Sequence, residues 1–203
     1  MLDKSLREIK EVTLLPVANQ IGTEIHPIAI SLVGLIVGCA SAVVAYLGVF
    51  PLALILLWIN RFLDGLDGTV ARNNKTQSDL GGYIDIQCDF VIYSVIPIAL
   101  AIRADDTATY IATMFLLGAF YVSAPSWMYL AAIFEKRNQG AKAQKELTST
   151  TMPAGLIEGT EAVIFYSLFL IFPGYSALLF TLLGVMVTIT IAQRIIWAAK
   201  HLE

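Results

Sequence analysis

The amino-acid sequence predicts an all-α polytopic membrane protein with six transmembrane helices and an N-terminal amphipathic helix at the membrane interface. Composition is the first reason. The 203-residue chain is 57% apolar and 14% charged, with a mean hydropathy of +0.73, whereas a soluble domain carries roughly 25% charged residues. The second reason is that apolar segments of about 20 residues, long enough to span a bilayer, recur along the chain.

Residues 2–15 are predicted to form the interfacial helix. Their apolar side chains recur at helical spacing on one face, and their basic side chains lie off that face, which is typical of a helix lying on a membrane. A solvated helix without membrane contact is the alternative. Pro16 is expected to end or kink the helix, because proline lacks the backbone donor that a helix interior needs.

Six transmembrane spans are predicted to follow. They cover residues 27–48, 51–72, 81–103, 107–134, 153–172 and 175–198. A proline opens the second span, and a Pro-Gly turn separates the fifth span from the sixth. Because these spans use most of the chain, residues 1–203 are predicted to form a single integral-membrane domain.

Lysine and arginine residues that flank the spans predict the orientation. With six spans, both termini lie on the same side as the loops after spans two and four. The basic residues on that side are Lys4, Arg7, Lys10, Arg72, Lys75, Lys136, Arg137, Lys142, Lys145, Arg194 and Lys200. The opposite side has only Arg103. Since cytoplasmic flanks are enriched in lysine and arginine, both termini are predicted to be cytoplasmic.

Four aspartates interrupt spans two and three. Asp64 and Asp67 are three residues apart, so they share one face of a helix. Asp85 and Asp89 are four residues apart and share a face in the same way. In an antiparallel pair of spans, the two pairs lie almost equally far from the connecting loop, so the four carboxylates match in depth. An ionised aspartate in hydrocarbon costs about 3 kcal/mol on insertion scales, so the cluster requires a compensating partner.

Four carboxylates at one depth predict a site for a hard divalent cation, Mg²⁺ or Mn²⁺. Zinc is disfavoured because no histidine or cysteine belongs to the predicted ligand set. A cation held there suits phosphoryl transfer, since it can bind phosphate oxygens and stabilise the charge of the transition state. Gly68 and Ala71 leave room for a bulky ligand, and Arg72 can form two hydrogen bonds to a phosphate.

This stretch resembles the signature of the CDP-alcohol phosphotransferases at every fixed position. The matching residues are Asp64, Asp67, Gly68, Ala71, Arg72, Gly81, Asp85 and Asp89. The six-span layout, with the motif on spans two and three, is similar to that family as well. The segment GLIEGTEAVIF resembles a bacterial inner-membrane branch of the family.

The resemblance implies an enzyme of phospholipid biosynthesis. It would transfer a phosphatidyl group from a CDP-linked lipid, CDP-diacylglycerol, to the hydroxyl of a small polar alcohol and release CMP. Serine, glycerol 3-phosphate, inositol phosphate and amino alcohols remain open as acceptors. Glycerol 3-phosphate is the less favoured of these, because the N-terminal segment lacks the Asn/Thr/Arg pattern of phosphatidylglycerophosphate synthases. The enzyme would be a homodimer in the inner (cytoplasmic) membrane, with its active site on the cytoplasmic side.

The resemblance also implies roles for the motif residues. Asp64, Asp67 and Asp85 would hold one or two Mg²⁺ or Mn²⁺ ions on the pyrophosphate. Asp89 would complete the cluster and act as general base on the acceptor hydroxyl. The CDP pocket would be formed by Gly68, Ala71, Arg72 and Gly81.

Three further charged residues are candidates for the site. Arg61, three residues before Asp64, is expected either to contact a lipid or acceptor phosphate or to form a structural ion pair. The ion pair is preferred, with Asp64, Glu158 or Glu161 as its partner. Glu158 and Glu161 either line the acceptor cavity or begin a helix, where acidic residues suit the positive end of the dipole. Asn60 is expected to form an ordinary interhelical hydrogen bond.

A membrane divalent-cation carrier or binding protein that uses the same aspartates is the alternative function. Transporters place their sites near the midplane, usually at broken helices, whereas these aspartates are predicted to lie near one membrane face. Nucleic acid is not an expected partner, because no basic face with interleaved aromatic residues is present. Membrane lipids are expected to surround the chain.

Overall fold

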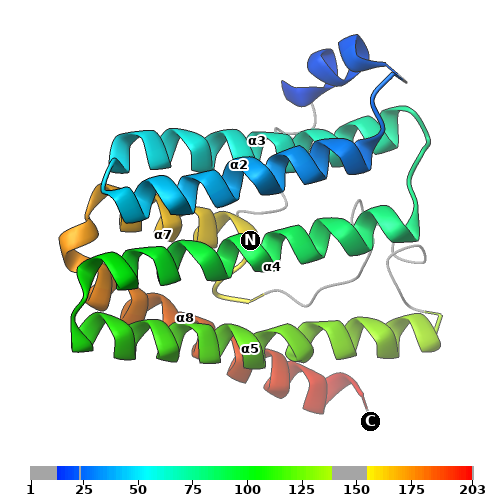
Figure 1. Cartoon of the computed structure of the whole chain (residues 1–203). Helices are drawn as coiled ribbons and strands as arrows, with labels where there is room; N and C mark the ends of the chain where they lie inside the picture. Colours follow the sequence, from blue (N-terminus) through cyan, green and yellow to red (C-terminus); the bar gives the residue numbers. More distant parts are fainter. Residues whose placement is uncertain (1–12, 23, 139–154, 203) are drawn as a thin grey trace. The chain divides into compact units, whose positions relative to one another are not determined.

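The computed structural model describes residues 13–22, 24–138 and 155–202. Helices make up most of them and no strand occurs within these ranges, which confirms the all-α prediction. Figure 1 shows the helices, whose bounds are α2 Pro27–Leu47, α3 Phe50–Asn73, α4 Asp79–Ala104, α5 Thr107–Lys136, α7 Gly159–Ile171, η1 Pro173–Tyr175 and α8 Ser176–His201.

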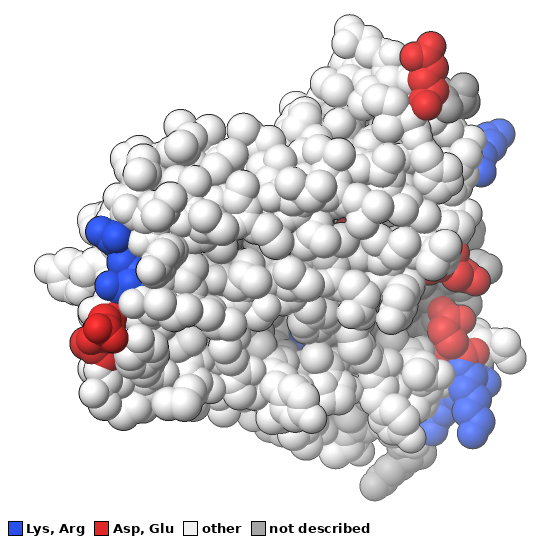
Figure 2. All heavy atoms as spheres, in the orientation of Figure 1, with Lys and Arg blue, Asp and Glu red and all other residues white. Residues whose placement is uncertain are grey.

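Four helical segments of the described chain are long and apolar enough to cross a membrane. They are Pro27–Leu47, Asp79–Ala104, Thr107–Lys136 and Pro173–His201. Helix α3 has 24 residues but a lower mean hydropathy because it carries charged side chains, and α7 has 13 residues. The count of six spans therefore stays a prediction. Many large apolar side chains are exposed, and most of the surface visible in Figure 2 is uncharged, as expected of a surface that faces lipid.

The chain divides into two compact units. The first comprises Met1–Asp106 and Tyr166–Ser176, and the second comprises Thr107–Phe165 and Ala177–Glu203. Helices α2, α3 and α4 therefore belong to the first unit. All of α5, the start of α7 and most of α8 belong to the second.

In the first unit, α2 packs against both α3 and α4. The Ser41 hydroxyl donates to the Ala53 carbonyl of α3 at 2.7 Å. Gly38 marks a close approach to α4, since a Cβ at this position would lie 2.9 Å from Cγ1 of Ile92. Small residues thus let α2 approach its neighbours closely, as is common between membrane helices.

The segment before α2 is helical over residues 13–21 and belongs to the same unit. Ala18 is fully buried in a cluster with Ile30 of α2 and with Leu66 and Val70 of α3. Pro16 does not end this helix, because residues 13–21 are helical through it. A kink at Pro16 stays a prediction. Residues 2–12 of the predicted interfacial helix lie outside the described residues.

A short connection joins α3 to α4. Ser78 is the N-cap of α4, and its hydroxyl accepts a hydrogen bond from the Gly81 backbone N–H at 3.1 Å. The Asn74 side chain, just after α3, donates to the Gly22 carbonyl. These contacts fix where α3 ends and α4 begins, and so they fix the register of the aspartates on the two helices.

The second unit differs from the sequence prediction at the start of the fifth span. The predicted span begins at residue 153, whereas α7 begins at Gly159, and residues 155–158 are not helical. Side chains of α8 explain the difference. Gln193 accepts from the Leu156 backbone N–H at 2.9 Å, and the Thr190 hydroxyl accepts from that of Ile157 at 2.9 Å. These donors are satisfied without a helical turn.

Candidate active site

The four aspartates occupy two neighbouring elements of the first unit. Asp64 and Asp67 lie on α3, and Asp85 and Asp89 lie on α4. Asp67 is 5% exposed and the other three are half-buried. Both Asp64 and Asp85 repel the Asp89 carboxylate electrostatically. The thiol of Cys88 interacts electrostatically with the carboxylates of all four motif aspartates. The fold therefore brings the carboxylates into one electrostatic cluster.

A metal ion would fit this cluster by its chemistry. The candidate donors are all carboxylate oxygens, which suit Mg²⁺ or Mn²⁺, and a cation would relieve their mutual repulsion. Among the described residues, however, no three His, Cys, Asp or Glu side chains converge closely enough to hold a metal. The roles of Asp64, Asp67, Asp85 and Asp89 as ligands therefore stay a prediction.

Asp67 receives a contact that the sequence reasoning missed. The hydroxyl of Ser31, on α2, donates a hydrogen bond to Oδ2 of Asp67, and Ser31 is itself 7% exposed. A hydrogen bond to a buried carboxylate stabilises its charged form. No motif spacing identifies Ser31, because it lies 36 residues before its partner. Its one signal is a hydroxyl within a largely apolar span, a signal that Ser41 of the same helix shares.

Arg61 forms an ion pair with Asp89. Its Nη1 lies 2.7 Å from Oδ1 of Asp89, and the two side chains are 10% and 33% exposed. The sequence analysis preferred an ion pair but named Asp64, Glu158 or Glu161 as the partner. The pair forms with Asp89 because the Arg61 side chain reaches that residue from α3, and both α3 and α4 pack against α2. Asp64 adds a longer-range attraction.

Asn60 supports Arg61 from the preceding position on α3. Its Oδ1 accepts from Nε of Arg61 at 2.8 Å, and its Nδ2 donates to the Gly34 carbonyl of α2 at 2.9 Å. The interhelical hydrogen bond expected of Asn60 is thus confirmed. The bond to Arg61 was not expected from the sequence.

The residues assigned to CDP binding have local contacts of their own. Arg72 folds back along α3, and its Nη2 donates to the Thr69 hydroxyl at 3.4 Å. Its Nη1 would lie 3.1 Å from a Cβ placed on Gly68, so glycine leaves the guanidinium room to lie over the helix. The Gly81 backbone N–H donates to the Ser78 hydroxyl that caps α4, and Ala71 is half-buried. Nucleotide binding by these residues stays a prediction.

Glu158 and Glu161 belong to the second unit, where Glu158 directly precedes α7 and Glu161 lies in its first turn. Oε1 of Glu158 accepts from the Gly155 backbone N–H at 3.1 Å, and Oε2 of Glu161 accepts from that of Glu158 at 3.2 Å. The Glu161 contact is one half of a capping box. These bonds supply the helix-start role considered from the sequence. A role in an acceptor cavity stays a prediction.

Arg194 is a buried residue that the sequence analysis counted only as a flanking charge. It is 4% exposed, and its Nη1 donates to the Ser123 hydroxyl of α5 at 3.2 Å. The Glu158 carboxylate attracts it electrostatically. The signal for a buried position is the sequence itself, since a single arginine lies about two turns before the end of an apolar helix.

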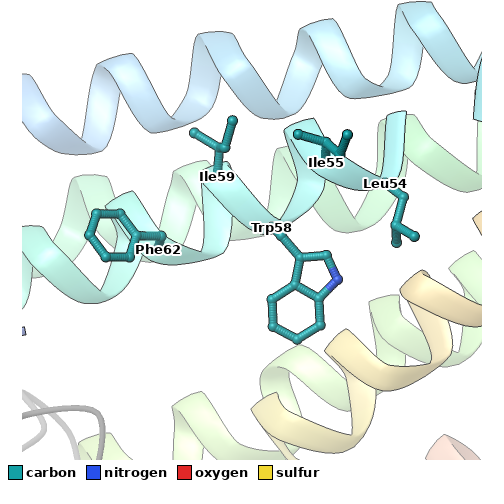
Figure 3. A pocket seen from close by; sticks show the side chains of 5 residues that line it. All are labelled: Leu54, Ile55, Trp58, Ile59 and Phe62. Atoms are coloured by element: carbon teal, nitrogen blue, oxygen red, sulfur yellow. The ribbon is translucent and has the colours of Figure 1, made fainter. Parts of the chain in front are cut away.

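A different, apolar hollow lies on the surface of α3. Its lining residues, shown in Figure 3, are Leu54, Ile55, Trp58, Ile59 and Phe62. Trp58 is 54% exposed. The hollow has no charged side chain, and its mostly apolar lining suits lipid tails.

Apolar helices that carry carboxylates on two adjacent spans define an integral-membrane protein with a polar site beside the membrane interior. The chain belongs to the CDP-alcohol phosphatidyltransferase family, because the model of that family matches residues 24–199. This confirms the resemblance found in the motif.

Individual relatives agree with this assignment. The Inner membrane protein YnjF of Escherichia coli is 32% identical over 173 residues, which are 84% of this chain and 82% of the relative. The Bifunctional IPC transferase and DIPP synthase of Archaeoglobus fulgidus is 30% identical over 129 residues, covering 64% of this chain and 26% of that protein.

Solved structures match the fold. Phosphatidylinositol phosphate synthase (PgsA1) of Mycobacterium tuberculosis with CDP-DAG bound has a TM-score of 0.69 and 21% identity, covering 90% of this chain and 91% of that one. The same protein in complex with manganese and citrate has a TM-score of 0.68 and 21% identity, covering 90% and 87%. At this identity the likeness establishes the fold.

Proposed function

We propose that this protein transfers a phosphatidyl group from CDP-diacylglycerol to the hydroxyl of a small polar alcohol, releasing CMP, in phospholipid biosynthesis. The observation that carries the proposal is the complete aspartate motif, folded onto α3 and α4 in a chain of this family. The similar fold of a protein solved with CDP-DAG supports the donor. The acceptor is left open among the alcohols named above.

Divalent metal dependence is part of the proposal. Asp64, Asp67, Asp85 and Asp89 would hold Mg²⁺ or Mn²⁺, and the manganese complex of the similar structure supports this. When bound, the ion supplies positive charge to the pyrophosphate and to the leaving CMP. Gly68, Ala71, Arg72 and Gly81 would receive the nucleotide, with the Arg72 guanidinium as a phosphate donor.

Asp89 is the proposed general base. The acceptor oxygen attacks the phosphorus that carries the diacylglycerol and forms a new P–O bond, while the pyrophosphate P–O bond breaks and CMP leaves. The hydroxyl proton passes to the Asp89 carboxylate. Because the ion pair with Arg61 uses Oδ1, Oδ2 is the oxygen placed to accept that proton.

The proposed setting is the inner membrane, with the termini and the active site facing the cytoplasm and with two chains forming a homodimer. The name of the E. coli relative supports the inner membrane, and the distribution of lysine and arginine supports the orientation.

Release of CMP tests the function directly. Purified protein with CDP-diacylglycerol and Mg²⁺ or Mn²⁺ is expected to release CMP when the correct alcohol of a panel is added, and to stop when a chelator removes the metal. D89N is expected to lower the rate about 100-fold or more, because general-base catalysis contributes that much. A matched D106N variant, which changes an exposed carboxylate outside the motif, is expected to keep the wild-type rate.

Two results would contradict the proposal. One is a wild-type protein that releases no CMP with any alcohol of the panel. The other is a D89N variant as active as the wild type. Metal flux through proteoliposomes without CMP formation would favour the cation carrier instead.

A further inference from the structure

The side chain of Arg61 is held on two sides within the first unit. It is 10% exposed, its Nη1 pairs with Asp89 on α4 at 2.7 Å, and its Nε donates to Asn60 at 2.8 Å. The guanidinium also lies over the ring of Tyr93, 5.7 Å from the centroid. Contacts at both Nε and Nη1 fix the plane of the guanidinium as well as its position.

Asn60 connects the Arg61–Asp89 pair to a third helix, α2. It is 2% exposed, and its Nδ2 donates to the Gly34 carbonyl of α2. Because Nδ2 is committed to a carbonyl and Oδ1 to an N–H donor, the amide can adopt one orientation without losing a hydrogen bond. The chain of contacts therefore runs from the α2 backbone through Asn60 and Arg61 to the carboxylate of Asp89.

The contacts of Arg61 orient its guanidinium as well as neutralise its charge. A buried arginine in a membrane span needs a partner, but a partner alone does not require a second residue to orient the guanidinium. The pair engages one oxygen of Asp89, and this sets the rotation of the carboxylate and the direction of the other oxygen. A reacting group displaced by about 1 Å can lose about 100-fold in rate, so this rotation matters for a base.

We infer that Arg61, oriented by Asn60, is a positioning residue that fixes the Asp89 carboxylate for proton transfer. The inference rests on the proposed function, since it gives Asp89 the role of base. In this inference Arg61 acts on the reaction through Asp89. The competing interpretation is that Arg61 contacts a lipid or acceptor phosphate directly, and the test distinguishes the two.

The test compares steady-state kinetics of R61M, R61K and N60A with the wild type, in the complete membrane protein. R61M is expected to lower kcat for CMP release about 10- to 100-fold, while KM for CDP-diacylglycerol and for the alcohol changes less than about twofold. R61K keeps the charge and is expected to recover part of kcat. N60A is expected to lower kcat in the same direction by a smaller factor.

The matched control is R103M. Arg103 is an exposed arginine of the same unit that donates to the Tyr46 carbonyl at 2.9 Å and lies over the Phe50 ring, so its removal reports on loss of an arginine contact away from the motif. It is expected to leave kcat unchanged. If R61M and R103M have the same kcat, or if R61M raises KM while kcat is kept, the inference is overturned.

A measurement that needs no enzyme turnover separates the positioning role of Arg61 from the proposed transferase function. Thermal unfolding of R61M, D89N and the double variant is expected to give non-additive shifts in melting temperature, because the two side chains interact. Additive shifts would overturn the inference even with an active wild type. Absence of CMP release by the wild type would instead overturn the proposed function, and the base role of Asp89 with it.

Discussion

Asp67 is the most buried of the four motif aspartates, at 5% exposure, and Ser31 is its neighbour from α2. A hydroxyl that donates to a buried carboxylate stabilises the charge and restricts the rotation of the side chain. If Asp67 is a metal ligand, Ser31 acts on the metal through it, as residues behind metal ligands commonly do.

Replacement of Ser31 by alanine tests this connection. S31A is expected to raise the Mg²⁺ or Mn²⁺ concentration needed for half-maximal CMP release about 10-fold or more, because Asp67 loses its hydrogen bond. S31T keeps the hydroxyl and should retain more of the metal affinity. The control S41A removes the buried Ser41 hydroxyl, which binds the Ala53 backbone carbonyl at 2.7 Å. Equal metal requirements for S31A and S41A would contradict the expectation.

Residue-scale prediction succeeded where the signal was local. The faces of Asp64 and Asp67 follow from helical spacing alone, and the interhelical bond of Asn60 follows from an amide in an apolar span. The partner of Arg61 could not be predicted in this way. Asp89 lies 28 residues away on α4, and the two side chains meet because α3 and α4 both pack against α2.

At the scale of elements, the close approach of α2 to α4 depends on Gly38. A Cβ there would lie 2.9 Å from Cγ1 of Ile92 and 3.0 Å from Nδ2 of Asn60. Both distances are shorter than ordinary contacts, so a methyl group would force the two helices or the Asn60 amide to move. Helix α2 therefore affects both the packing of α4 and, through Asn60, the position of Arg61.

Alanine at position 38 is expected to destabilise the fold by about 1–3 kcal/mol, the usual effect of overpacking, as measured by thermal unfolding in detergent. The control G34A adds the same methyl group one turn earlier, where the nearest side-chain atom, Cβ of Leu63, would be 3.5 Å away. Shortening the clashing side chain, in G38A/I92V, is expected to recover part of the loss. Equal stability of G38A and G34A would show that the close approach is not limiting.

Helix boundaries show where hydropathy suffices and where it does not. The predicted span 27–48 differs from α2 by one residue at its end, and 51–72 differs from α3 by one at each end. The predicted span 153–172 fails at its start, because Thr190 and Gln193 of α8 bind the backbone that would otherwise begin the helix. Hydropathy does not report a competing side chain from another helix.

At the scale of the whole molecule, the orientation in the membrane is predicted from the distribution of lysine and arginine. The connection between α3 and α4 is predicted to face the cytoplasm together with the aspartates, and the turn after α4 is predicted to face the opposite side. These two loops are exposed at Thr76 and at Asp106, so each offers a position for chemical labelling.

Cysteine labelling tests the orientation. In a background with Cys39 and Cys88 replaced, T76C is expected to react with a membrane-impermeant maleimide in inside-out vesicles but not in intact spheroplasts. D106C is the matched control and should show the reverse pattern. The physical reason is the enrichment of cytoplasmic flanks in lysine and arginine. Labelling of T76C from the outside would reverse the proposed topology.

The sequence by itself determined the helical membrane class, most of the helix limits and the two faces that carry the aspartates. These properties depend on hydropathy and spacing within one segment, where neighbours in the chain are also neighbours in space. Only the tertiary structure decided that Arg61 pairs with Asp89, that Ser31 binds Asp67 and that α7 starts at Gly159. The two residues of each contact lie 28 to 37 positions apart in the chain, and they meet because whole helices pack together.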